Sequence, residues 1–163
     1  MRPLPNRDHN YGQPIPEPPQ AKHQLWISGQ PFADDHIQLQ KCGIIAVCSL
    51  TDDPFSFPEH IAHLQLQIED RIDEEISQHF DTTYKFIEEH RQKGNVLVHC
   101  MAGVSRSATI CTYYLMRKWR WGAELSLSAV RSGRPFVRPN DGFYRELRRA
   151  EVELGMVFGR ARF

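Results

Sequence analysis

The feature that most constrains this chain is a short stretch at residues 95–107, which reads Asn-Val-Leu-Val-His-Cys-Met-Ala-Gly-Val-Ser-Arg-Ser. Its apolar, β-branched start at residues 96–98 predicts a buried strand. The strand leads into a loop with Gly103 at its centre, and Arg106 and Ser107 then open a helix. A tight loop before a helix N-terminus directs several backbone N–H groups at one point, and the helix dipole attracts anions there. The stretch therefore predicts an anion-binding loop.

Three side chains make this loop a candidate catalytic centre. Cys100 lies at its start, where the same field favours the thiolate over the thiol. Arg106 offers a planar fork of donors that matches two phosphate oxygens at once, which a lysine cannot do. Ser107 can donate a hydroxyl hydrogen bond to the sulfur. The predicted chemistry is attack of a thiolate on a phosphoryl group through a covalent thiophosphate.

A purely structural role is the alternative for these residues. A cysteine after an apolar strand is most often a small buried hydrophobic residue, and a glycine in a loop before a helix often marks only a turn. Arg106 favours the catalytic interpretation, because the helix dipole disfavours a cation at the N-terminus unless an anion is bound there. A nucleotide-type phosphate loop is excluded, since the stretch lacks Gly-Lys-Ser/Thr.

The pattern His99-Cys100-x-x-Gly103-x-x-Arg106-Ser107 resembles the signature loop of the cysteine-dependent protein tyrosine phosphatases. Its Ser-Arg-Ser-Ala continuation is similar to the small dual-specificity branch of that superfamily. Three other segments resemble it as well: Leu-Trp-Ile-Ser-Gly at 25–29, Tyr-Leu-Met at 114–116 and Pro-Asn-x-Gly-Phe at 139–143. The resemblance covers roughly residues 25–154. Together with the order of predicted elements, it implies a three-layer α/β fold with a mostly parallel sheet of four or five strands between helices.

The resemblance implies a role for each residue of the loop. Cys100 is the nucleophile, Arg106 holds the phosphate, and Ser107 stabilises the departing thiolate. His99 and Asn140 are the supporting residues. The phosphate-binding positions are Met101, Ala102, Gly103, Val104, Ser105 and Arg106.

A general acid is predicted after a stretch of alternating polarity. Leu64, Leu66 and Ile68 alternate with polar residues, which predicts a strand with one solvated face, and Asp70 follows it. Ends of parallel strands border the ligand crevice of such a sheet. The resemblance agrees, because the family's acid lies about thirty residues before the cysteine. The rival is Asp73, which fits a helix-capping position and is assigned that role.

The expected substrates are phosphoproteins, dephosphorylated at phosphotyrosine and at phosphoserine or phosphothreonine. The variable positions Met101, Ala102, Val104 and Ser105 carry no positive charge, whereas relatives that act on inositol lipids often have lysine or arginine there. The alternatives are a phosphatase of phosphoinositides, RNA 5′-phosphates or glucans, and a non-catalytic phosphate-binding module. The absence of Cys-x-x-Cys disfavours a thiol-transfer enzyme. No metal or other cofactor is expected, because no zinc-ligand spacing occurs.

Length and composition indicate one soluble domain. The 163 residues are 40% hydrophobic and 25% charged, with a net charge of zero. No apolar segment approaches the ~20 residues that span a bilayer, and no signal peptide is visible. A cytoplasmic or nuclear monomer without nucleic-acid or membrane partners is therefore expected. The basic side chains in residues 117–163 are expected on solvated helix faces.

The termini are predicted to be tails. Residues 1–22 contain six of the eleven prolines and are expected to form an extended, flexible tail. The catalytic domain then covers residues 23–157, and residues 158–163 form a short basic tail. The four cysteines do not form a disulfide framework. Cys111 lies too far along its helix to bridge to Cys100, and no disulfide between Cys100 and Cys48 is expected on oxidation.

Apolar spacing predicts the remaining elements. A helix is expected over residues 33–41 with Ile37 inward, and a buried strand over residues 44–50. A helix that ends at Gly94 is predicted by helical spacing of Ile76, Phe80, Thr83 and Ile87.

The segments after the loop are expected to be helical. The helix from Arg106 should run through the core until Gly122 breaks it. Residues 123–132 fit a strand or a helix, and the resemblance favours the helix. The last helix is expected to begin at Asn140 or Asp141, one of which caps it. Phe55 and Phe57 lie in an earlier loop that borders the active cleft in the family that the chain resembles. They are therefore expected either on the wall of the cleft or in the core, and the core is favoured.

Overall fold

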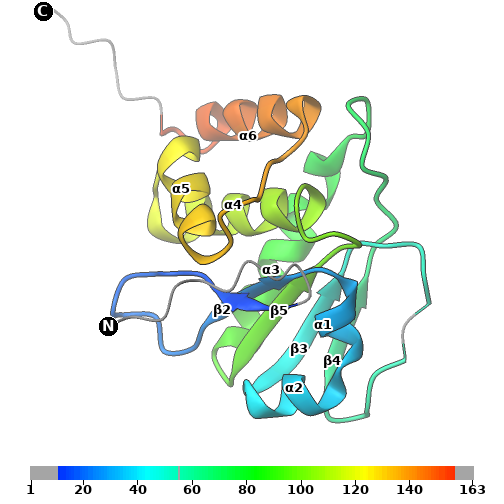
Figure 1. Cartoon of the computed structure of the whole chain (residues 1–163). Helices are drawn as coiled ribbons and strands as arrows, with labels where there is room; N and C mark the ends of the chain where they lie inside the picture. The colour runs from blue at the N-terminus through cyan, green and yellow to red at the C-terminus, as the bar shows by residue number, and fades with distance from the viewer. Residues whose placement is uncertain (1–10, 55, 157–163) are drawn as a thin grey trace, which may run out of the picture.

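A five-stranded sheet lies between two layers of helices in the computed structural model, which describes residues 11–54 and 56–156 (Figure 1). The strands lie side by side in the order β1 (Gln13–Pro14), β2 (Leu25–Ser28), β5 (Asn95–His99), β3 (Ile44–Ser49) and β4 (Ala62–Gln65). All neighbouring strands are parallel except β1, which is antiparallel to β2. The predicted α/β fold with a mostly parallel sheet is confirmed.

Helices cover both faces of this sheet. On one face lie α1 (Gln30–Asp34) and α2 (His36–Lys41). On the other lie α3 (Phe80–Arg91) and α4 (Arg106–Trp119), and α4 is covered in turn by α5 (Ala123–Gly133) and α6 (Asp141–Glu153). A short 3₁₀ helix, η1 (Ile76–His79), leads into α3. None of the helices in the described part of the chain is both long and apolar enough to cross a membrane.

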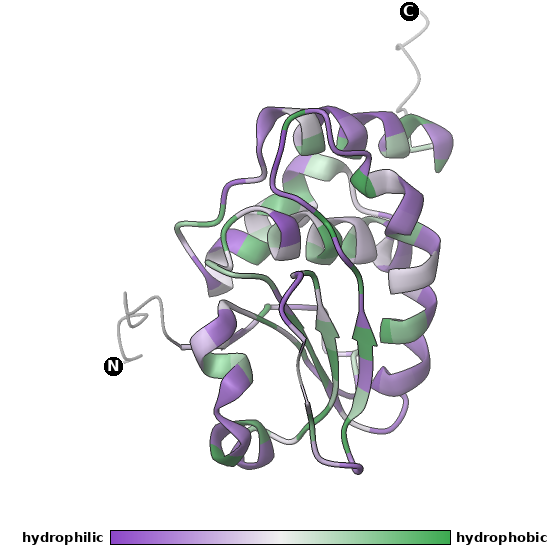
Figure 2. Ribbon diagram, turned by 90° about the vertical axis from the view of Figure 1, so that its right-hand side faces the viewer, coloured by the Kyte–Doolittle hydropathy of each residue, from purple (hydrophilic) through white to green (hydrophobic). Residues whose placement is uncertain are grey.

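Strand β5 is buried on both sides, as its apolar run predicts. Val96 and Val98 pack in the larger core beneath α3 and α4, whereas Leu97 packs in the smaller core with Phe32 and Leu39. Figure 2 shows the hydrophobic residues gathered on the central strands and the hydrophilic ones on the outer faces of the helices. The strand that carries the loop is therefore among the most firmly held parts of the molecule.

Several predicted helices are confirmed. The stripe of Ile76, Phe80, Thr83 and Ile87 is buried, and residues 107–116 of α4 are buried on every side. Residues 123–133 form the helix that the resemblance favours, not a strand. Asn140 caps α6 by accepting a hydrogen bond from the N–H of Phe143 at 2.9 Å.

The helix predicted over residues 33–41 is wrong in its extent. Asp35 interrupts it, because its side chain accepts a hydrogen bond from the N–H of Gln38 and so starts a new helix there. Because a separate helix begins after Asp35, a different set of side chains faces the sheet. Ile37 is 67% exposed, and Leu39 is buried instead. The inward position predicted for Ile37 is therefore wrong.

Two further boundaries differ from the prediction. Strand β4 ends at Gln65, so Asp70 does not follow a strand directly but lies in the loop beyond it. Helix α3 ends at Arg91, three residues before Gly94. The first difference arises because β4 is an edge strand with a single partner, β3, and pairing stops where β3 stops.

Asp73 is not a helix cap. The residue before η1 is Glu75, whose side chain makes no capping bond, and Asp73 lies exposed in an ion pair with Arg71 at 2.8 Å. A nearby arginine offers the carboxylate a stronger partner than a short 3₁₀ turn. The capping role predicted for Asp73 is therefore wrong.

The prediction of a flexible tail is wrong for residues 11–22. Gln13 and Pro14 form β1, an edge strand that tolerates proline because one side of its backbone needs no partner. Glu17, whose side chain is only 4% exposed, pairs with Arg91 of α3 at 2.7 Å. Residues 1–10 and the basic tail at 158–163 lie outside the described residues.

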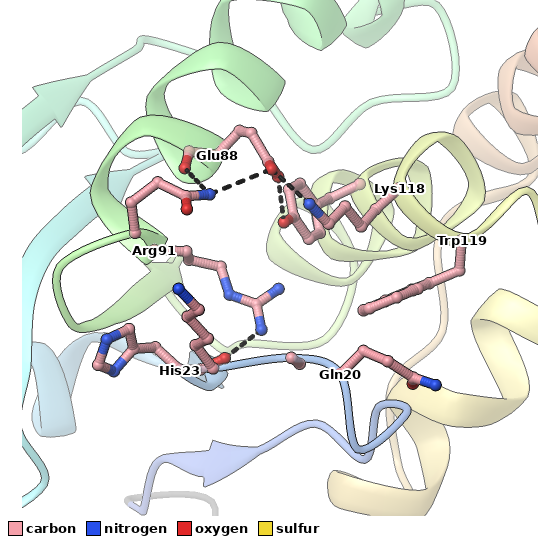
Figure 3. Close-up of a pocket in the computed structure, with 10 residues that line it drawn as sticks. Gln20, His23, Glu88, Arg91, Lys118 and Trp119 are labelled. Atoms are coloured by element: carbon pink, nitrogen blue, oxygen red, sulfur yellow. Dashed lines mark hydrogen bonds and ion pairs between the residues drawn. The ribbon is translucent and has the colours of Figure 1, made fainter.

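A small pocket lies where this N-terminal segment crosses α3 and α4. Figure 3 shows Gln20 and His23 on one side of it, and Glu88, Lys118 and Trp119 on the helices opposite. Its volume is about 130 Å³. Phe57, predicted in the core, is partly buried against the smaller core, and Phe55 lies outside the described residues.

Candidate active site

The loop between β5 and α4 turns its carbonyl groups outward. Each carbonyl from Met101 to Ser105 accepts a hydrogen bond from outside the loop. The donors, in order, are Gln30 N (2.9 Å), Arg134 Nη2 (3.2 Å), Arg134 Nε (2.9 Å), Arg138 N (2.7 Å) and Thr109 N (2.9 Å). The C=O and N–H of one peptide unit point in opposite directions, so the N–H groups that follow these carbonyls face the inside of the loop. This is the cradle of donors that the sequence predicts.

Gly103 is required for this shape. Its φ of +67° lies in the left-handed region that side chains disfavour. A Cβ at this position would lie 2.6 Å from backbone atoms of Ser28 and Gly29, at the end of β2. The loop therefore leans directly on the neighbouring strand, and any other residue at position 103 would push it away.

Cys100 lies at the floor of the cradle. It is only 2% exposed, and its Sγ lies 3.2 Å from the Oγ of the fully buried Ser107. Ser107 is in the first turn of α4, whose N-terminus faces the same point. The predicted contact between the serine hydroxyl and the sulfur is present, and the positive end of the helix dipole adds to it.

Among the residues that the structure describes, Arg106 is held by carbonyl groups and not by a carboxylate. Its Nη1 donates to the carbonyls of Ile68 at 2.9 Å and Leu50 at 3.3 Å. Its Nε is buried without a partner among the described residues, and no described carboxylate forms an ion pair with the guanidinium. A guanidinium fixed from behind in this way keeps donors for an anion in the cradle.

Asp70 reaches the loop through Asn140. The Nδ2 of Asn140 donates to Asp70 Oδ1 at 2.9 Å, while its backbone N–H donates to Ser105 Oγ at 2.9 Å. The structure thus brings Asp70, Asn140 and the loop together. Asp73 is held elsewhere, where the hydrogen bond from Arg71 lowers its pKa and so disfavours the protonated form that an acid needs.

The structure adds a polar relay behind the cysteine that the sequence did not predict. The ring of buried His99 faces Ser49 Oγ with Nε2 at 2.6 Å and the Cys100 carbonyl with Nδ1 at 3.3 Å. Ser49 Oγ also lies 2.9 Å from His63 Nε2. Burial lowers the pKa of His99 to about 4, so the ring is neutral near pH 7. The only sequence signal for Ser49 is its position at the end of a strand that is predicted to be buried. That strand end lies beside His99.

The relay has a definite direction. The Cys100 carbonyl can only accept, so Nδ1 of His99 carries the proton. Nε2 of the neutral ring must then accept, which assigns the hydroxyl proton of Ser49 to it. Ser49 in turn accepts from Nε2–H of His63. His99 is therefore fixed in one tautomer, which supports its predicted role as a residue that orients the loop.

Arg134 is the second residue that the sequence did not identify. Its side chain is fully buried, and it donates to the carbonyls of Ala102 and Gly103. Burial lowers its pKa to about 10. The expectation that the basic residues of the last third lie on solvated faces is therefore wrong here. No local pattern distinguishes this arginine from its exposed neighbours, because its partners are distant in sequence.

The cysteines are free, as expected. Burial raises the pKa of Cys48 to about 12, which keeps it a thiol and a poor nucleophile. Burial also raises the pKa of Cys111. The absence of a Cys100–Cys48 disulfide under oxidation stays a prediction. Within the described residues, no cluster of three or more His, Cys, Asp or Glu side chains is arranged to hold a metal ion.

Comparison with known proteins agrees with this geometry. Residues 25–153 match the family model described as dual specificity phosphatase, catalytic domain. The chain is 37% identical to human dual specificity protein phosphatase 22 over 128 residues, which are 78% of this chain and 70% of that protein. The crystal structure of DUSP15 superposes with a TM-score of 0.74 and 31% identity, covering 83% of this chain and 92% of the other.

Other relatives are longer proteins. A probable dual specificity protein phosphatase of Dictyostelium discoideum is 40% identical over 117 residues, which are 71% of this chain but only 30% of that protein. The chain spans 15% of a second relative from the same organism, a MAP kinase phosphatase with leucine-rich repeats. The family match covers the part of the chain that contains the site. The chain belongs to the dual specificity phosphatase family.

Proposed function

We propose that this protein is a phosphoprotein phosphatase that works through a cysteinyl-phosphate intermediate. One observation carries the proposal: a thiol, a serine hydroxyl and an arginine with no carboxylate partner among the described residues converge on a loop whose carbonyls are all turned away. Such a site stabilises a dianion and offers it a nucleophile. The names of the relatives, which are dual specificity phosphatases, support the same reaction.

In the first step, the Cys100 thiolate attacks phosphorus opposite the ester oxygen. The S–P bond forms as the bond to the leaving oxygen breaks, and Arg106 and the loop N–H groups hold the three equatorial oxygens as charge spreads over them. Asp70, in its protonated form, gives its proton to the leaving oxygen. This matters most for serine and threonine esters, because alkoxides leave poorly.

In the second step, water attacks the thiophosphate and Asp70 takes its proton. The S–P bond breaks, inorganic phosphate forms, and the electron pair returns to sulfur. The hydroxyl of Ser107, 3.2 Å from Sγ, stabilises the thiolate as it leaves. Asn140 holds Asp70 close to the loop through both steps.

Phosphoproteins are the proposed substrates, with both phosphotyrosine and phosphothreonine accepted. The side chains at loop positions Met101, Ala102, Val104 and Ser105 bring no positive charge, which a polyphosphorylated inositol headgroup would need. A cytoplasmic or nuclear location, a monomeric state and the absence of nucleic-acid partners remain part of the proposal.

The test is turnover by the purified wild-type protein and by Cys100→Ser. Wild type should hydrolyse p-nitrophenyl phosphate and phosphotyrosine and phosphothreonine peptides faster than a phosphoinositide. Cys100→Ser should lose turnover but still bind phosphate, because Arg106 and the loop amides remain. Vanadate should inhibit competitively, and EDTA should have no effect.

The alternatives predict different results. Inactive wild type that binds phosphopeptides would identify a non-catalytic phosphate-binding module. Faster turnover of a phosphoinositide, an RNA 5′-phosphate or a phosphoglucan than of phosphopeptides would overturn the substrate class but keep the reaction. Retained turnover by Cys100→Ser above a few per cent would remove the nucleophile assignment.

A further inference from the structure

The N-terminal segment reaches the back of the phosphate loop through one arginine. Arg134 Nη1 donates to the carbonyl of Tyr11 at 2.7 Å and to Gln13 Oε1 at 2.8 Å. Both acceptors precede residue 25, where the match to the family model begins. They therefore lie outside the matched catalytic domain, and they contact the residue that supports the loop.

The other edge of the same guanidinium holds the loop. Nε donates to the carbonyl of Gly103 at 2.9 Å and Nη2 to that of Ala102 at 3.2 Å. Because the guanidinium is planar and rigid, the position of the edge near Gln13 determines the position of the edge near the loop. The ring of Phe136, 4.4 Å away, covers one face of the plane.

The N-terminal acceptors are themselves fixed in place. Gln13 and Pro14 pair in register with Ile27 and Trp26 of β2. On the other side, Gly133 of α5 approaches the Pro14 carbonyl so closely that a Cβ would lie 2.7 Å from it. The segment is thus held between the sheet edge and α5, and it can act as a firm support for Arg134.

We propose that Tyr11 and Gln13 position the phosphate loop through Arg134, so that the N–H groups of Gly103 and Val104 stay aimed at the phosphoryl group. These two N–H groups belong to the same peptide units as the carbonyls that Arg134 binds. The proposal rests on the proposed phosphatase reaction and adds an N-terminal segment to its machinery. Gln13 is a positioning residue, since it acts only through Arg134.

The kinetic signature follows from what the loop amides do. They bind an equatorially charged transition state more strongly than phosphate itself, so a slightly displaced loop should lose vanadate affinity more than phosphate affinity. We expect Gln13→Ala to lower kcat and to weaken vanadate inhibition by about fivefold relative to phosphate inhibition. A purely structural role would lower thermal stability and leave the vanadate-to-phosphate ratio unchanged.

Two matched variants complete the experiment. Gln13→Glu keeps an acceptor facing Arg134 and should restore the wild-type ratio. Glu17→Gln lies on the same segment but at its far end, where it contacts Arg91 and Trp119. It should lower the melting temperature without changing the ratio or the kcat per folded molecule. All four proteins, used as full chains, are compared in melting temperature, kcat and the two inhibition constants.

The outcomes separate this inference from the proposed function. Active wild type with an unchanged ratio in Gln13→Ala would overturn the positioning role alone. A changed ratio in Glu17→Gln equal to that in Gln13→Ala would also overturn it, because a general loss of stability would then explain both. Inactive wild type would instead contradict the phosphatase proposal itself, before any variant is compared.

Discussion

Two arginines at opposite ends of strand β5 have opposite kinds of partner. Arg91 precedes the strand, is 5% exposed in its side chain, and makes a two-point ion pair with Glu17 at 2.7 and 2.9 Å. Burial opposes its charge, but the hydrogen bonds and charge of Glu17 outweigh this and raise its pKa. Arg106 follows the strand and is held only by carbonyl groups within the described part of the chain.

The difference shows which end of the sheet is built for a ligand. At the far end, the neighbouring cation is also neutralised within the protein, because Lys118 pairs with Glu88, and Glu88 accepts from Tyr114 at 2.6 Å. At the loop end, the guanidinium of Arg106 adds to the positive helix dipole and no described carboxylate balances it. A buried cation that is paired with an acid is a structural device, whereas a cation at a helix N-terminus with no acid partner among the described residues is favourable when an external anion is bound there.

The largest effect should come from Arg106, which has no acid partner in the described part of the chain. Arg106→Lys replaces two parallel donors by a point charge, so kcat/KM should fall about 10³-fold and vanadate inhibition should weaken in parallel. Steady-state kinetics with an aryl phosphate measure both. If Arg106→Lys kept most of the wild-type kcat/KM, the claim that Arg106 stabilises the transition state would be contradicted.

The opposite variant should affect stability and not catalysis. Arg91→Met leaves Glu17 buried without its cation, and this should lower the free energy of unfolding by about 3 kcal/mol. Urea unfolding measures the loss, and vanadate binding to the folded fraction should be unchanged. A large loss of vanadate affinity with normal stability would show that the far end also serves the reaction.

The third prediction separates the two acids near the loop. Asp70→Asn should lower kcat about 10²-fold for alkyl phosphates, and less for aryl phosphates whose leaving groups need little protonation. It should also flatten the basic limb of the pH–rate profile. Asp73→Asn is the matched control and should behave like wild type. The reverse result would assign the acid role to Asp73.

The smallest effect should come from the relay behind the cysteine. Ser49→Ala removes the hydroxyl group that donates to Nε2 of the buried His99, and we expect kcat to fall about fivefold. His63→Gln should retain most of the activity, because the glutamine amide can donate to Ser49 from a similar position. An equal loss of kcat in both variants would show that activity needs the imidazole ring of His63 itself and not only a hydrogen-bond donor at its position.

The parts of the site that were predictable are local in sequence. The strand, Gly103, Arg106 and Ser107 lie within one stretch, where periodicity, turn chemistry and capping act over a few residues. The cap at Asn140 is local in the same sense. Asp70 was identified by its spacing, although the strand expected to carry it ends at Gln65.

The parts that were not predictable depend on distant contacts. Arg134 is buried because Tyr11 and Gln13, more than a hundred residues earlier, meet it beside the loop. The prolines of the N-terminal segment predicted an extended tail. The composition of this segment does not show that it pairs with the edge of β2 as an added strand. Such contacts follow from the assembled sheet and not from local propensity.

The central claim is that the Cys100 sulfur becomes phosphorylated during turnover, and trapping that species tests it most directly. Wild-type protein is mixed with excess p-nitrophenyl phosphate, quenched in acid within the first turnover and digested for mass spectrometry. We expect one phosphoryl group on the peptide that contains Cys100 and no phosphorylated peptide from Cys100→Ser. When hydrolysis of the intermediate is slower than its formation, we also expect a burst of nitrophenol equal to the enzyme concentration. Turnover in which no phosphate is ever found on Cys100, or in which it is found on another residue, would contradict the account.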